Sequence, residues 1–72
     1  METLGRQIAT RRQQVGFQTQ SALAKATGVP QPTISRIESG EMAPTRQTMA
    51  RLAGALQCVF MTTRDGTALV TT

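Results

Sequence analysis

The stretch of sequence that decides the fold is residues 19–40, TQSALAKATGVPQPTISRIESG. Thr19 can cap the start of a helix with its hydroxyl, and Gly28 can adopt the left-handed backbone that ends one. Pro32 is tolerated only in the first turn of a helix, so a second helix must begin just before it. The stretch therefore predicts two short helices joined by a tight turn, residues 20–27 and 31–39.

Helical patterns flank this stretch on both sides. Upstream, apolar residues recur at helical spacing and predict a helix over residues 4–15, with Thr3 as its cap. Downstream, Thr45 can cap a fourth helix, in which apolar residues recur at i, i+3, i+4 and i+7: Met49, Leu52, Ala53 and Leu56. Residues 1–57 are therefore predicted to form one mainly α-helical domain, a compact bundle of four short helices.

The last fifteen residues, 58–72, differ from the helical segments in composition. Residues 58–63 and 67–72 are rich in β-branched and apolar side chains, and the Arg64-Asp65-Gly66 sequence between them is typical of a hairpin turn. Because a lone hairpin is rarely stable in water, residues 58–72 are predicted to be a strand or hairpin that serves in dimerisation. Pairing across a two-fold axis would bury Val59, Met61, Leu69 and Val70. The alternatives are a frayed tail in which only the first strand is ordered, and packing of the hairpin on the fourth helix of its own chain.

Composition limits the possible functions. Eight Lys and Arg residues against four acids give a formal charge of +4, which favours nucleic acid as a partner. With no His and one Cys, neither a metal site, a cofactor nor a catalytic nucleophile pair is predicted, so the protein is not expected to be an enzyme. Cys58 is expected to be a small buried residue. Without an apolar span or a signal peptide, a cytoplasmic protein with no membrane contact is expected.

Two short helices joined by a tight turn form the helix-turn-helix geometry, in which the second helix presents side chains to the major groove of DNA. In the second predicted helix, Ile34 and Ile37 must face the core. Polar side chains then turn outward: Gln31, Thr33, Ser35 and Arg36. Gln can pair with adenine and Arg with guanine, so this surface predicts binding to double-stranded DNA.

Residues 19–24, TQSALA, and 28–40, GVPQPTISRIESG, resemble the lambda-repressor-like (Xre/Cro-type) helix-turn-helix family. The family pattern is T-Q-x-x-L-A followed by G-V-S-x-x-x-I-S-x-x-E-x-G, and the similarity covers residues 4–56. The resemblance implies base reading by three side chains, Gln31, Ser35 and Arg36. It implies phosphate contacts by four others, Gln20, Thr33, Thr45 and Arg46. It also implies a structural ion pair between Arg12 and Glu38.

The chain departs from the family pattern at several positions. Pro30 replaces the usual Ser, so the second helix loses a side-chain cap. Gln18 lengthens the preceding turn by one residue. Arg11 stands where the family usually has a core Leu, and its head group could reach either the rim of the domain or the DNA. Glu41 places an acid in a loop where relatives often have Lys.

The strand-like ending resembles that of HipB-type and HigA-type antitoxins. The sequence thus predicts a homodimeric, sequence-specific repressor that binds a palindromic DNA operator, with the narrower hypothesis that it is an autoregulating antitoxin with a toxin protein as partner. Alternatives in the same class are a phage Cro-like repressor and a restriction-modification controller protein. A different class is a protein-interaction module that neutralises a partner with little DNA binding. A toxin-like reading frame beside the gene would favour the antitoxin hypothesis.

Overall fold

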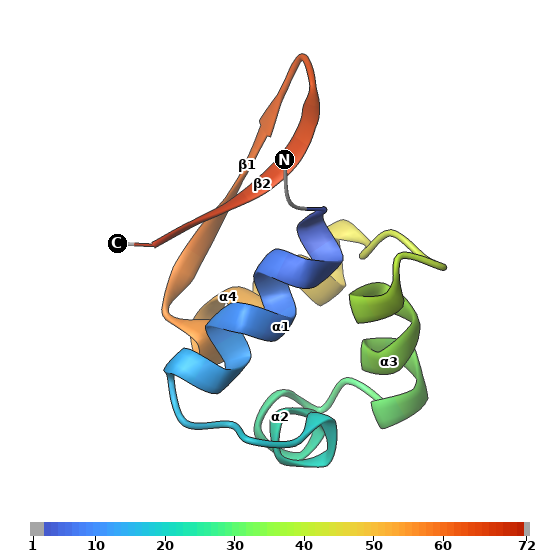
Figure 1. Ribbon diagram of the computed structural model, residues 1–72, viewed down its shortest axis with the longest axis vertical. Coiled ribbons are helices and arrows are strands. Elements are labelled where there is room, and N and C mark those ends of the chain that lie inside the picture. Colours follow the sequence, from blue (N-terminus) through green and yellow to red (C-terminus); the bar gives the residue numbers. More distant parts are fainter. Residues whose placement is uncertain (1–2, 72) are drawn as a thin grey trace.

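Four helices are followed by a two-stranded hairpin in the computed structural model, which describes residues 3–71 (Figure 1). The elements are α1 (Leu4–Gln14), α2 (Gln20–Thr27), α3 (Gln31–Ser39), α4 (Arg46–Leu56), β1 (Cys58–Thr63) and β2 (Gly66–Thr71). Along the longest axis of the molecule, the hairpin lies at one end and α2 at the other (Figure 1). The predicted fold, a helical bundle containing a helix-turn-helix and ending in a hairpin, is confirmed. Thr72, the end of the second predicted strand, lies outside the described residues.

The helix ends follow the predicted capping residues. The hydroxyls of Thr3, Thr19 and Thr45 each accept a hydrogen bond from the backbone N–H three residues later, at 3.3, 3.1 and 3.1 Å. Gly28 has a φ of 79°, in the left-handed region, and ends α2. Pro30 precedes α3 and forms no side-chain cap, because its ring carries no hydrogen-bonding group. The first helix ends at Gln14, one residue before the predicted end.

The core is built from residues of all four helices, the α2–α3 turn and the first residue of β1. Its buried members are Ile8, Leu23, Val29, Ile34, Ile37, Leu52, Leu56 and Cys58. Burial raises the pKa of the Cys58 thiol, and the positive charge of Arg11 opposes this shift. Cys58 is thus a buried thiol, as predicted. Across residues 3–71, no helix combines the length and the apolar character that crossing a membrane requires.

A close approach between α1 and α3 depends on Gly5, which is buried in the first turn of α1. A Cβ atom at this position would overlap the carbonyl oxygen of Ile37 and lie 2.7 Å from that of Glu38. Only glycine allows the backbone of α1 to pack directly on the end of α3.

Arg11 joins α1 to the junction between α4 and β1. Its Nε donates a hydrogen bond to the carbonyl of Leu56 at 2.9 Å, and its Nη2 donates to the carbonyl of Gln57 at 3.2 Å. Gln57 has a φ of 52°, an unfavourable value for a residue with a side chain. The sequence left open whether the Arg11 head group reaches the rim of the domain or the DNA. In the structure it lies at the rim of the domain. There it satisfies carbonyls at the end of α4 that have no partner within the helix.

The hairpin packs on its own chain with one face and exposes the other. In the antiparallel register, Phe60 faces Leu69 and Val59 faces Val70. Phe60 and Leu69 pack against the core, whereas Val59, Met61 and Val70 are 46%, 54% and 39% exposed. The sequence prediction grouped Leu69 with the dimerisation residues, but its side chain lies on the inner face, because side chains alternate between the two faces of a strand. The three other predicted dimerisation residues are exposed.

Candidate nucleic-acid interface

The α2–turn–α3 unit presents one polar surface of α3 to solvent. Ile34 and Ile37 are 1% and 2% exposed and hold α3 on the core. Gln31 and Arg36 are exposed and Ser35 is half-buried. The three predicted base-reading residues therefore lie on the side of α3 that points away from the core.

A buried ion pair joins α3 to α1. The Nε of Arg12 in α1 lies 2.9 Å from Oε2 of Glu38 in α3, and the two side chains are only 8% and 7% exposed. Arg12 also donates from Nη2 to Oε1 of Glu38 at 3.4 Å and from Nη1 to the carbonyl of Phe17 at 2.9 Å. The residues named as a structural ion pair are thus in direct contact, and the pair joins α1, α3 and the chain before α2.

Hydrogen bonds continue from this ion pair to the surface of α3. Gln20, the first residue of α2, donates from Nε2 to Oε1 of Glu38 at 3.0 Å. Gln31, the first residue of α3, donates from Nε2 to Oε1 of Gln20 at 2.8 Å. The motif predicts a phosphate contact for Gln20, and the structure adds two side-chain bonds that the sequence does not indicate.

The other predicted phosphate contacts lie at the starts of two helices. Thr33 is half-buried in the first turn of α3, and Arg46 is exposed at the first position of α4. The Thr45 hydroxyl caps α4, because it accepts from the N–H of Thr48 at 3.1 Å and donates to the Thr48 hydroxyl at 3.0 Å. Arg46 is the one of these residues that carries a positive charge toward solvent.

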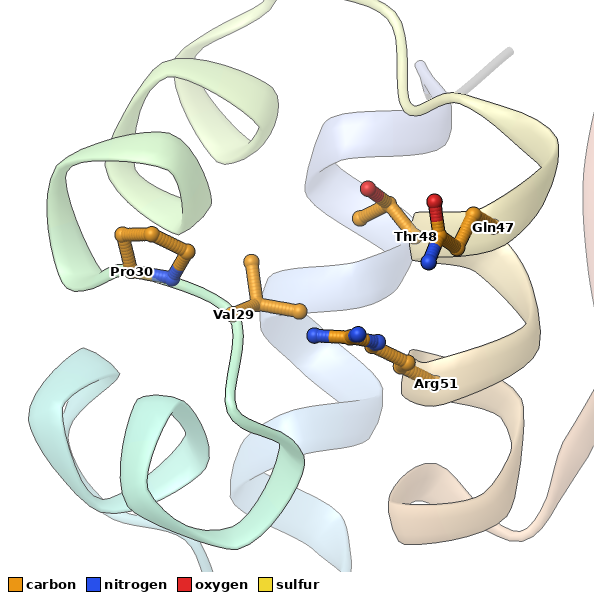
Figure 2. A pocket seen from close by; sticks show the side chains of 5 residues that line it. All are labelled: Val29, Pro30, Gln47, Thr48 and Arg51. Atoms are coloured by element: carbon orange, nitrogen blue, oxygen red, sulfur yellow. The ribbon is translucent and has the colours of Figure 1, made fainter.

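An open recess of about 130 Å³ lies between the α2–α3 turn and α4 (Figure 2). It is lined by Val29, Pro30, Gln47, Thr48 and Arg51. Figure 2 shows that the Arg51 side chain extends from α4 toward the turn, where its Nη1 lies 3.6 Å from the position that a Cβ of residue 28 would occupy. The sequence leaves the role of Arg51 undecided, because only the packing of α4 on α2 brings this guanidinium beside the turn that leads into α3.

The charge of this surface is positive. Arg36, Arg46 and Arg51 are exposed on α3 and α4, whereas the carboxylate of Glu38 is buried and neutralised by Arg12. Glu41 is exposed in the loop after α3. Exposed guanidinium groups beside outward-facing amide and hydroxyl groups suit a surface that must meet both phosphates and base edges.

Comparisons with known proteins agree with this geometry. The model of a helix-turn-helix family matches residues 8–59. A crystal structure of the P22 c2 repressor protein, in complex with the synthetic operator 9T in the presence of Tl+, is similar, with a TM-score of 0.73 and 34% sequence identity over 81% of this chain and 86% of that chain. No curated protein sequence matches the chain.

Proposed function

Because the chain belongs to the helix-turn-helix family, we propose that it is a sequence-specific transcriptional repressor that binds double-stranded DNA as a homodimer on a palindromic operator. The observation that carries this proposal is the outward placement of Gln31, Ser35 and Arg36 on α3, directly after the α2–α3 turn. The similarity to a repressor solved with operator DNA supports the same function.

In this proposal, α3 enters the major groove and positions its polar side chains against base edges. Gln31 pairs with adenine and Arg36 with guanine, while Ser35 reaches a base edge with its hydroxyl. Backbone phosphates are held by the residues around the starts of the helices: Gln20, Thr33, Thr45 and Arg46. Arg51, beside the recess in Figure 2, adds a positive charge next to the α2–α3 turn. The repressor would act by occupying a promoter.

Two arginine substitutions separate base reading from phosphate binding. We expect Arg36→Ala to weaken binding to the selected operator by about 1–3 kcal/mol and to relax the base preference at one position of each half-site. We expect Arg46→Ala to weaken binding to all sequences evenly and to lower the slope of log K against log salt by about 1. Site selection from a random duplex pool, followed by fluorescence-anisotropy titrations at several salt concentrations, measures both effects.

The same selection tests the proposal as a whole. Recovery of a palindrome by the folded wild-type chain supports a dimeric operator-binding repressor. Recovery of no motif by a chain that circular dichroism shows to be folded contradicts sequence-specific binding. That outcome would favour the alternative class, a protein-interaction module.

The outer face of the hairpin supports the proposed dimer. Val59 and Val70 are cross-strand neighbours, and together with Met61 they form an exposed apolar surface. At Leu69 the outer edge of β2 is already occupied, because its N–H donates to Oε1 of Gln7 in α1 at 2.8 Å. We therefore place strand pairing with the second copy at β1. A two-fold dimer sets the two copies of α3 one DNA turn apart, about 34–36 Å, which requires a palindromic site.

Charge on this apolar face should separate the two chains. We expect Val59→Glu to give a folded monomer that binds the full palindrome at least tenfold more weakly, because two carboxylates would have to be buried at one interface. Sedimentation velocity measures the mass, and anisotropy measures the affinity. Gln13→Glu, an equal change of charge at an exposed position of α1, is the control and should remain a dimer. A Val59→Glu chain that stays dimeric would place the interface elsewhere.

The narrower proposal, an autoregulating antitoxin, is supported by the hairpin ending alone. It predicts that the product of the adjacent gene forms a complex with this chain and is toxic when expressed without it. Co-expression and separate expression of the two genes test this, and a harmless neighbour that does not bind would favour the Cro-like or controller alternatives.

A further inference from the structure

The start of α3 offers few backbone donors to a DNA phosphate. The first N–H groups of a helix usually have no partner within it and therefore bind anions. In α3 the second residue is Pro32, which has no N–H. The N–H groups of Thr33 and Ile34 both donate to the carbonyl of Pro30, at 3.0 and 3.1 Å. In the first turn of α3, only the N–H of Gln31 is thus left for an anion.

The recess in Figure 2 lies beside this helix start, which is poor in donors. Pro30 forms part of one wall, next to the proposed base-reading residue Gln31. Gln47 and Thr48 of α4 line the recess from the other side, and they directly follow the proposed phosphate contact Arg46. The recess therefore lies between the starts of α3 and α4. A DNA strand that contacts both helix starts passes across it.

Three side chains of α4 bring hydrogen-bond donors to the recess: Gln47, Thr48 and Arg51. The Thr48 hydroxyl accepts a hydrogen bond from the Thr45 hydroxyl at 3.0 Å, so its own proton is available. Among the residues that the structure describes, Arg51 has neither a hydrogen-bond partner nor an ion-pair partner. Its Nη1 lies 3.6 Å from the position that a Cβ of residue 28 would occupy, so the guanidinium already lies against the α2–α3 turn.

We propose that Arg51, together with Thr48, binds a backbone phosphate of the DNA at this recess and supplies the donors that the start of α3 lacks. This inference rests on the proposed function. A guanidinium can bind a phosphate through two parallel N–H bonds, and charge-assisted bonds of this kind are about twice as strong as neutral ones. Because the bound group is the backbone, the contact fixes the position of α3 on the duplex and carries no base preference.

Replacing Arg51 with methionine tests the contact. We expect Arg51→Met to weaken binding to the selected operator about tenfold and to lower the slope of log K against log salt by about 1, with an unchanged base preference. Arg64→Met is the matched control, because it removes the same charge from the exposed turn of the hairpin, at the far end of the molecule from α2 (Figure 1). It should weaken binding by no more than about twofold, since salt screens a distant charge. Anisotropy titrations at several salt concentrations measure both variants.

Methylphosphonate substitution locates the phosphate. Each phosphate of one half-site is replaced in turn by a neutral methylphosphonate, and the affinities of the wild type, Arg51→Met and Arg46→Ala are compared. We expect the wild type to lose affinity at several positions. Arg51→Met should be insensitive at one of these positions, and Arg46→Ala at a different one. If Arg51→Met stays sensitive at every position that affects the wild type, the proposed contact is overturned.

A serine at position 30 should reduce the dependence on Arg51. Pro30→Ser adds a backbone N–H and a hydroxyl at the start of α3, and both can donate to a phosphate. We expect Arg51→Met to weaken operator binding by only about threefold in the Pro30→Ser chain, instead of about tenfold in the wild type. An equal loss in both chains would contradict the inference that Arg51 replaces donors missing from α3.

A purely structural role for Arg51 gives a different result. A guanidinium that only stabilises the C-terminal end of α2 affects the thermal midpoint, and its loss leaves the salt slope and the methylphosphonate pattern of the folded protein unchanged. That outcome overturns the proposal, and circular dichroism supplies the folded concentration that the comparison needs. A wild-type chain that selects no operator contradicts the repressor function itself. A wild-type chain that binds its operator with the same affinity and salt slope as Arg51→Met contradicts only the contact at the recess.

Discussion

Replacing Arg12 with methionine should lower the free energy of unfolding by about 3–5 kcal/mol, because Glu38 would be left as a buried charge without its partner. The Glu38 side chain is only 7% exposed, so water cannot replace the guanidinium. The carbonyl of Phe17 would lose its donor as well. Domains of this length rarely have more than about 3–5 kcal/mol of stability from a single core, so we expect the variant to be largely unfolded. Urea titration followed by circular dichroism measures the loss.

Arg6→Met is the matched control for this substitution. Arg6 lies on the same helix and is exposed, so its replacement should change the stability by less than about 0.5 kcal/mol. A similar loss in both variants would show that the effect comes from the charge or helix propensity of α1. A stable Arg12→Met chain would mean that Glu38 finds another partner or reaches water.

Substituting Gly5 with alanine should also destabilise the protein, by about 3 kcal/mol, in the upper part of the range for overpacked sites. The new Cβ would overlap the carbonyl of Ile37 and lie 2.7 Å from that of Glu38, and both neighbours are backbone atoms that cannot rotate away. Helix propensity alone predicts the opposite sign, since alanine is favoured over glycine in a helix. The thermal midpoint should fall by roughly 4–8 °C for each kcal/mol of stability that is removed.

Gly54→Ala should change the stability in the opposite direction from Gly5→Ala. Gly54 lies inside α4, and a Cβ there would meet nothing within 4 Å. We expect this variant to be more stable than the wild type by about 0.5–1 kcal/mol. If both glycine variants gain stability, α1 and α3 pack less closely than the structure shows.

The ion pair links stability with recognition. The Glu38 carboxylate that holds α3 to α1 also accepts the bond from Gln20 that leads to Gln31. The DNA affinities of variants at these positions must therefore be referred to a measured concentration of folded protein, because a smaller fraction of folded chain lowers the affinity for every sequence alike.

The elements themselves could be predicted from the sequence because the interactions that bound them are local. Thr3, Thr19 and Thr45 each cap a helix through an N–H only three residues away. Gly28 ends α2 through its own backbone conformation. The hairpin turn at Arg64 and Asp65, which is closed by the pairing of Thr63 with Gly66, needs no partner outside the hairpin. The Arg12–Glu38 pair came from the family resemblance and not from spacing, since its members are 26 residues apart.

Only the packing of the helices decided the remaining features. Arg11 donates hydrogen bonds to the carbonyls of Leu56 and Gln57, which are 45 and 46 residues away in the sequence. Gln57 has a left-handed backbone and lies where the chain turns from α4 into β1. The inner position of Leu69 depends on how the hairpin lies against α1, and the bonds from Gln31 through Gln20 to Glu38 require α2 and α3 to be docked. Such interactions join residues whose separation in sequence carries no periodic signal. Local pattern therefore specifies the helices and the hairpin, whereas tertiary packing determines which side chains they bring together.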